Sequence, residues 1–105
     1  MSQFDEPDNS FEGKFAHDEE MLFRILARRN RLLGAWASRL MGLSEAEAEA
    51  YSKDLVRADF EGGGGKDVVL KLLGDLTAAG VEIDEDRIRE AIKKKLVEAR
   101  RQLIG

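Results

Sequence analysis

The chain of 105 residues has no cysteine, one histidine and one proline, and these scarcities limit its chemistry. Without cysteine it has no disulfide, thiolate zinc site or thiol nucleophile. The single histidine, His17, excludes a multi-histidine metal site and argues against a serine–histidine–aspartate hydrolase. We therefore expect no catalytic residue and no metal ligand, and we predict that the protein is not an enzyme.

Long apolar runs are also missing. No run approaches the roughly 18 residues that a membrane span requires. The N-terminus is acidic (MSQFDEPDNSFEG), the opposite of a secretory or transit signal. We therefore expect a cytoplasmic protein without direct membrane insertion. Its 43% of hydrophobic residues suffice for a core that needs no metal or disulfide.

Charge alternates along the chain around a net value of -4. Residues 1–20 contain seven acids and one lysine, whereas residues 21–43 contain five arginines and no acid. Such alternation is typical of solvated helix faces that attract one another, or of an acidic and a basic segment that bind different partners. The overall acidity argues against a nucleic-acid partner.

The hydrophobic pattern predicts an all-α four-helix bundle with a long first helix and a flexible N-terminal arm at residues 1–17. The helices are expected at about residues 18–42, 44–60, 67–79 and 84–104 of a domain that spans 18–105. Ser44 with Glu47 forms a capping box, and Asp84 caps the last helix. The apolar stripe of the first helix is predicted to contain Leu22, Ile25, Leu26, Leu32, Leu33, Trp36, Leu40 and Leu43.

Arg29 interrupts this stripe, since it projects between Leu26 and Trp36 on the helical period. A guanidinium at such a position needs a carboxylate, an aromatic face or an anionic ligand. Two interpretations stay open here. One is a salt bridge to the acidic second helix, and the other is a phosphate-bearing ligand held by Arg28 and Arg29.

The arm has a pattern of its own, because Phe11 and Phe15 are four residues apart. On a helix they would share one face, which could enter a partner's groove or fold back onto the bundle. Phe4 could serve as a more distal anchor. His17, amid acidic residues, is either a pH sensor or an ordinary solvated side chain.

The text FEGKFAHDEEMLFRILARRNRLLGAWA, from Phe11 to Ala37, resembles the zeta subunit family. These are small all-α regulators of the F-type ATP synthase in alphaproteobacteria. Later segments agree with the resemblance, namely AYSKDLVRADFE, LTAAGVEIDEDRIRE and VEARRQLIG. The chain departs from the family at residues 62–65, where four glycines stand in place of acidic residues and proline.

The resemblance implies a four-helix bundle that regulates the synthase as an inhibitor. Its N-terminal segment, about residues 1–19, is expected to enter the catalytic head between a catalytic and a non-catalytic subunit. There it would block the rotation that accompanies ATP hydrolysis, with synthesis much less affected. The expected contact residues are Phe4, Phe11, Lys14, Phe15, Ala16 and His17.

The same resemblance implies an alternative function, because family members are reported to bind adenine nucleotides on the bundle. The protein would then be a nucleotide-sensing module with weak or no inhibition. We place ADP or ATP at Arg28 and Arg29 only because Arg29 lies within the apolar stripe of the first helix. The nucleotide would be a regulatory ligand and not a required cofactor. Either function puts the protein in the cytoplasm, peripheral to the inner membrane through the synthase.

Overall fold

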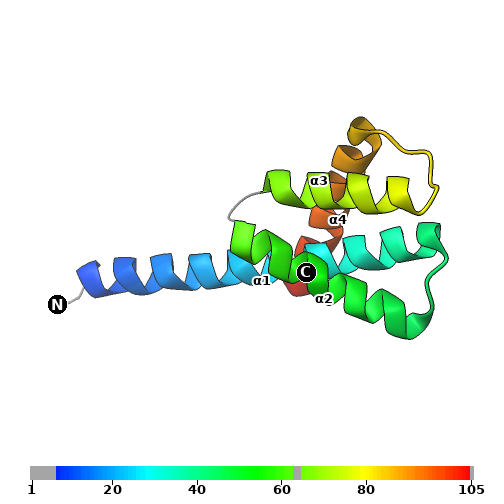
Figure 1. Ribbon diagram of the computed structural model, residues 1–105. Helices are drawn as coiled ribbons and strands as arrows, with labels where there is room; N and C mark the ends of the chain where they lie inside the picture. Colours follow the sequence, from blue (N-terminus) through cyan, green and yellow to red (C-terminus); the bar gives the residue numbers. More distant parts are fainter. Residues whose placement is uncertain (1–6, 63–64, 105) are drawn as a thin grey trace.

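The computed structural model describes residues 7–62 and 65–104, with side chains from Asp18 onward. Those residues form four helices and no strand: α1 (Pro7–Met41), α2 (Glu45–Gly62), α3 (Gly65–Ala78) and α4 (Glu85–Ile104). In Figure 1, α1 is much the longest helix, and its first turns project beyond the other three. The predicted all-α class and the long first helix are confirmed.

Helix α1 begins earlier than the sequence pattern indicated, since the backbone of residues 7–17 is already helical. Pro7 is well suited to a first helical turn, where its missing N–H has no partner to lose. The predicted helix start at Asp18 is therefore wrong, and residues 7–17 extend α1. The predicted mobility of this segment stays a prediction, and residues 1–6 lie outside the described residues.

The predicted helix caps are present. The backbone N–H of Ser44 donates to Glu47 Oε1 at 2.9 Å, and the N–H of Glu47 donates to Ser44 Oγ at 3.2 Å. Asp84 Oδ1 accepts from the backbone N–H of Arg87 at 2.9 Å. Gly42 ends α1 with a φ of 73°, a left-handed conformation that glycine adopts without strain. Local sequence therefore determines where α1 ends and where α2 and α4 begin.

The core lies between the second half of α1 and the other three helices. Its members come from every helix and are Leu33, Ala37, Leu55, Val68, Val69, Leu72, Leu76 and Ile88. Two predicted stripe residues are exposed instead, Leu22 to 55% and Leu40 to 41%. At the N-terminal end the reason is length, because α1 extends there beyond the helices that cover its middle (Figure 1).

Helix α1 packs mainly against α2 and α4, and α3 packs on α2 and α4 from the other side. Helix α4 runs back across the bundle, so that the C-terminus comes to lie beside the middle of α1 (Figure 1). A bond of 2.8 Å from Arg28 Nη1 to Gln102 Oε1 joins the two helices there. The point where α1 leaves the bundle is therefore flanked by the last turn of α4.

Candidate functional site

The predicted inhibitory segment occupies the first turns of α1. Its described backbone is helical from Pro7 onward, and among the side chains that the structure describes, from Asp18 onward, the first buried apolar one is Ile25. At about 1.5 Å per residue, the helix therefore extends about 27 Å ahead of its first core contact. Five predicted contact positions lie on this extension, where the backbone alone is described: Phe11, Lys14, Phe15, Ala16 and His17. Phe4 lies outside the described residues.

Arg29 is buried in a polar cluster between α1 and α2. Its Nη2 atom lies 3.4 Å from Asp59 Oδ2, and its Nε donates to Asn30 Oδ1 at 3.1 Å. The Nδ2 of Asn30 donates to the same Asp59 oxygen at 2.9 Å. Burial lowers the pKa of the Arg29 guanidinium, while the Asp59 carboxylate favours its charged form. The predicted salt bridge to the second helix is confirmed.

Arg28 has different surroundings, although it is the next residue. Besides its bond to Gln102, it lines a recess of about 280 Å³ between α1 and the last turn of α4. The guanidinium of Arg29 is held by Asn30 and Asp59 instead, and Arg29 as a whole is only 7% exposed. The two arginines thus bind different polar partners, and their role in nucleotide binding stays a prediction.

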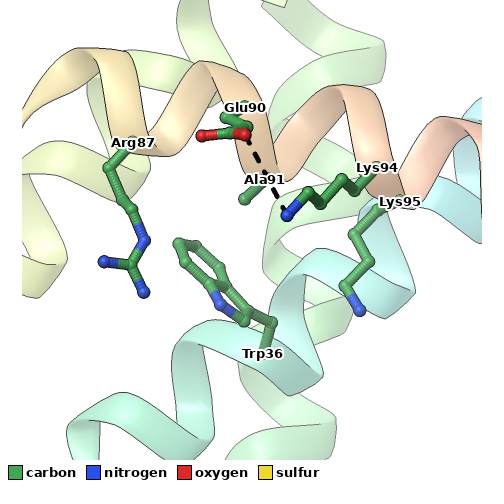
Figure 2. Close-up of a pocket in the computed structure, with 6 residues that line it drawn as sticks. All are labelled: Trp36, Arg87, Glu90, Ala91, Lys94 and Lys95. Carbon is green, nitrogen blue, oxygen red and sulfur yellow. Dashed lines mark ion pairs between the residues drawn. The ribbon is translucent and has the colours of Figure 1, made fainter.

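A second cavity combines an aromatic face with positive charge (Figure 2). Trp36 of α1 forms one wall, and Arg87, Lys94 and Lys95 of α4 surround its indole. Glu90 lies 4.0 Å from the Lys94 ammonium and offsets part of that charge. The cavity measures about 190 Å³, less than the roughly 300 Å³ at which ligand pockets usually begin. It can hold one group of a ligand, a flat ring or a phosphate.

Sequence reasoning missed this cavity because it assigned Trp36 to the core stripe. The helical period puts a tryptophan beside the core, but it does not say which edge of the ring stays open. A usable signal was the basic run at residues 93–95, preceded by Arg87 two turns earlier on the same helix. Only the crossing of α4 over α1 shows that these cations face the indole.

Two further classes of site are absent from residues 7–62 and 65–104. That part of the chain contains no cluster of three or more histidine, aspartate or glutamate side chains placed to hold a metal ion. It also contains no helix that is both long and apolar enough to cross a membrane.

Comparison with known proteins identifies the family. A family model described as ATPase inhibitor subunit zeta matches residues 1–102. The chain belongs to this family. A structure solved by solution NMR is similar to the zeta-family chain at 39% identity and a TM-score of 0.70, over 80% of this chain and 95% of the other. No curated protein matches.

Membership confirms the resemblance seen in the sequence. The family is one of inhibitor subunits, so the zeta-family chain is a regulatory protein and not an enzyme. Its partner is an ATP synthase.

Proposed function

We propose that the zeta-family chain inhibits ATP hydrolysis by inserting its N-terminal segment, about residues 1–19, into the catalytic head of an F-type ATP synthase. The segment enters between a catalytic and a non-catalytic subunit. The observation that carries this proposal is the division of α1. The helix runs unbroken from Pro7 to Met41, yet the buried apolar residues of the described chain all lie between Ile25 and Ala99.

The widths of the N-terminal turns of α1 and of the bundle support insertion of the helix alone, with the bundle remaining outside. A single helix with its side chains is about 10–12 Å wide, a width that a groove between two subunits accommodates. The molecule as a whole measures 61 × 24 × 22 Å. The bundle is therefore too broad to follow the helix into such a groove, and it stays outside. Because α1 is continuous, a push on the inserted end is transmitted directly to the bundle.

Several further assignments belong to this proposal. Inhibition by contact needs no cofactor, because the inserted helix acts by occupying space. The contact residues are those predicted from the sequence, with Phe11 and Phe15 one helical turn apart. The protein acts in the cytoplasm and reaches the inner membrane only through the synthase.

The test is a titration of the purified chain into the soluble catalytic head of its own organism's synthase during steady ATP hydrolysis. We expect a saturating loss of hydrolysis with the full chain, and none after deletion of residues 1–19. The full-length variant Phe11→Ala/Phe15→Ala should also lose inhibition. The matched control is Leu70→Ala, since Leu70 is 55% exposed on α3, outside the inserted helix.

The circular dichroism spectrum of each variant checks that the bundle remains folded. A deletion of residues 1–19 that inhibits as well as the full chain would contradict the insertion mechanism. So would a Leu70→Ala variant that loses as much inhibition as the phenylalanine pair.

A second function is favoured by the Trp36 cavity. We propose that an adenine nucleotide binds there as a regulatory ligand, with its base against the indole and its phosphates beside Arg87 and Lys94. Stacking on an indole suits any flat base, and nearby cations favour a phosphate group. This differs from the site predicted at Arg28 and Arg29, where the second guanidinium is already held by Asn30 and Asp59.

Trp36 is the chain's only tryptophan, so its fluorescence reports on the cavity directly. We expect ADP to quench it in the wild type and to do so much less in Arg87→Glu/Lys94→Glu. Both side chains are exposed, so the fold should tolerate the change. Arg28→Glu is the matched control: if it alone abolishes nucleotide binding, the ligand lies at the site predicted from the sequence.

A further inference from the structure

Two phenylalanine rings pack against each other outside the core. Phe23 of α1 and Phe60 of α2 lie with their ring centroids 5.4 Å apart and their planes at 77°, an edge-to-face arrangement. Phe23 is nevertheless 51% exposed and Phe60 is 68% exposed. Exposed aromatic pairs are depleted on ordinary protein surfaces and enriched where proteins meet. The pair is therefore a candidate contact surface.

A recess next to the pair is lined by three arginines and three apolar residues. It has a volume of about 280 Å³ and is lined by Phe23, Arg24, Ala27, Arg28, Arg31 and Leu103. Arg24 is paired with Glu20 at 3.3 Å, but both side chains are about 60% exposed. Among the residues with described side chains, no carboxylate lies within 4.0 Å of Arg28 or Arg31. We call these six residues with Phe60 the arm-base surface.

The arm-base surface is a direct continuation of the segment proposed to insert. Phe23 is on α1 itself, about 24 Å along the helix from Pro7 at 1.5 Å per residue. A partner that encloses the first turns of α1 must therefore end its groove close to Phe23. The rim of that groove is then the surface that meets the rings and arginines.

We propose that the arm-base surface docks onto an acidic, partly apolar patch on the outer rim of the same catalytic head. The inference rests on the proposed function and adds a second contact to it. The phenylalanines supply apolar area, and the arginines supply charge that an acidic partner complements. Insertion blocks rotation, and docking determines how tightly the inhibitor is held.

A second copy of the chain fits this surface less well than an acidic partner. A symmetric dimer brings the same patch of each protomer together. The arginines of the recess would then face their own copies, and like charges across an interface are unfavourable. The surface is better matched to a partner of opposite charge.

The test measures binding of the full chain to the immobilised catalytic head by biolayer interferometry. Phe23→Ala/Phe60→Ala should weaken binding about tenfold or more, as expected for aromatic anchors of an interface. Arg28→Glu/Arg31→Glu should slow association and reduce its dependence on salt. All four residues lie outside the fully buried core, so the bundle should fold in both variants.

Two controls match these changes elsewhere on the bundle. Leu70→Ala/Val97→Ala removes apolar side chains of similar exposure, 55% and 56%. Lys53→Glu/Arg57→Glu reverses two exposed charges on α2. Both controls should bind within about twofold of the wild type, as is usual for residues outside an interface.

The outcomes separate this inference from the proposed function. If the wild type inhibits but Phe23→Ala/Phe60→Ala binds as tightly as the apolar control, the arm-base surface is not a contact and only this inference fails. If the wild type does not bind the head, both fail. If sedimentation shows a wild-type dimer that the phenylalanine variant abolishes, the surface joins two copies and the inference is overturned. Weakened binding with inhibition still complete at saturation supports it.

Discussion

The two halves of α1 are one continuous helix in two different environments. Residues 25–41 contain the buried positions of α1, among them Leu33 and Ala37 of the core. Residues 18–24 have no buried side chain, and the turns before them lead away from the bundle (Figure 1). The same apolar residue type, leucine, is 55% exposed at position 22 and 0% exposed at position 33.

This difference shows that helix formation and burial have separate causes. The backbone hydrogen bonds of a helix join residues four apart, so local propensity carries α1 through both halves. Burial requires another helix packed closely alongside: Phe23 contacts Phe60 of α2, yet both rings remain more than half exposed. A segment that is helical but uncovered is what a partner's groove can enclose.

The largest expected effect compares leucines in the two halves. Leu33→Ala should lower the free energy of unfolding by about 3–4 kcal/mol, because it leaves a cavity in a fully buried site. Leu22→Ala should change it by less than about 0.5 kcal/mol, as is usual for an exposed position. Urea unfolding followed by circular dichroism measures both. Equal losses would show that the outer half is packed after all.

The second comparison uses a charge pair from each half. Asp59→Ala should cost about 3 kcal/mol, because it leaves the Arg29 guanidinium buried without its carboxylate. Glu20→Ala breaks the exposed pair with Arg24 and should cost less than about 0.5 kcal/mol. Unfolding by urea again measures both. The double variant Arg29→Met/Asp59→Leu should recover most of the loss, since no unpaired charge remains; failure to recover would point to packing instead of charge.

The third comparison uses glycines that differ in the space around them. A Cβ at Gly34 would lie 2.6 Å from Ser52 Cα, so Gly34→Ala must push α1 and α2 apart. It should cost about 1–2 kcal/mol despite the better helix propensity of alanine. A Cβ at Gly74 of α3 meets nothing within 4 Å, so Gly74→Ala should stabilise by about 0.5–1 kcal/mol. Thermal unfolding should show shifts of opposite sign, and shifts of the same sign would refute the close approach.

The smallest expected effect concerns the cap at the junction of α1 and α2. Hydrogen bonds from Ser44 lower the pKa of the Glu47 carboxyl below its ordinary value. The carboxylate therefore contributes stability above the unfolded pKa of about 4.3, and that contribution is lost as pH falls through the lower folded value. Ser44→Ala removes the side-chain hydrogen bond and keeps the larger one from the backbone N–H, so it should raise the pKa of Glu47 only part of the way toward its ordinary value, as an NMR titration measures. An unchanged pKa would show that the Ser44 hydroxyl takes no part in holding the carboxylate in solution.

Helix number, type and most boundaries could be predicted from the sequence, because they depend on neighbours a few residues away. The capping box at Ser44 and the cap at Asp84 are examples. The start of α1 could not be placed from charge and glycine content, since these suggested an unfolded segment. Pro7 was the available signal for a helix start, and it was not used.

The candidate sites could likewise be predicted from the sequence only in part. The pairing of Arg29 with the second helix followed from its position within an apolar stripe, but the identity of its partners did not. Asn30 and Asp59 are brought together only by the crossing of α1 and α2. The Trp36 cavity and the Phe23–Phe60 pair likewise join residues from helices far apart in sequence.

The sequence by itself determined the family, the four helices and the helix caps, because motifs and backbone bonds are local. It also determined that the protein lacks the cysteines and histidines of many catalytic and metal sites. Only the tertiary structure decided which part of α1 is covered, which glycine is a close contact, and which cations face Trp36. These depend on how the helices cross. The crossing is set by contacts between side chains of different helices, and the helical period of one segment contains no information about those contacts.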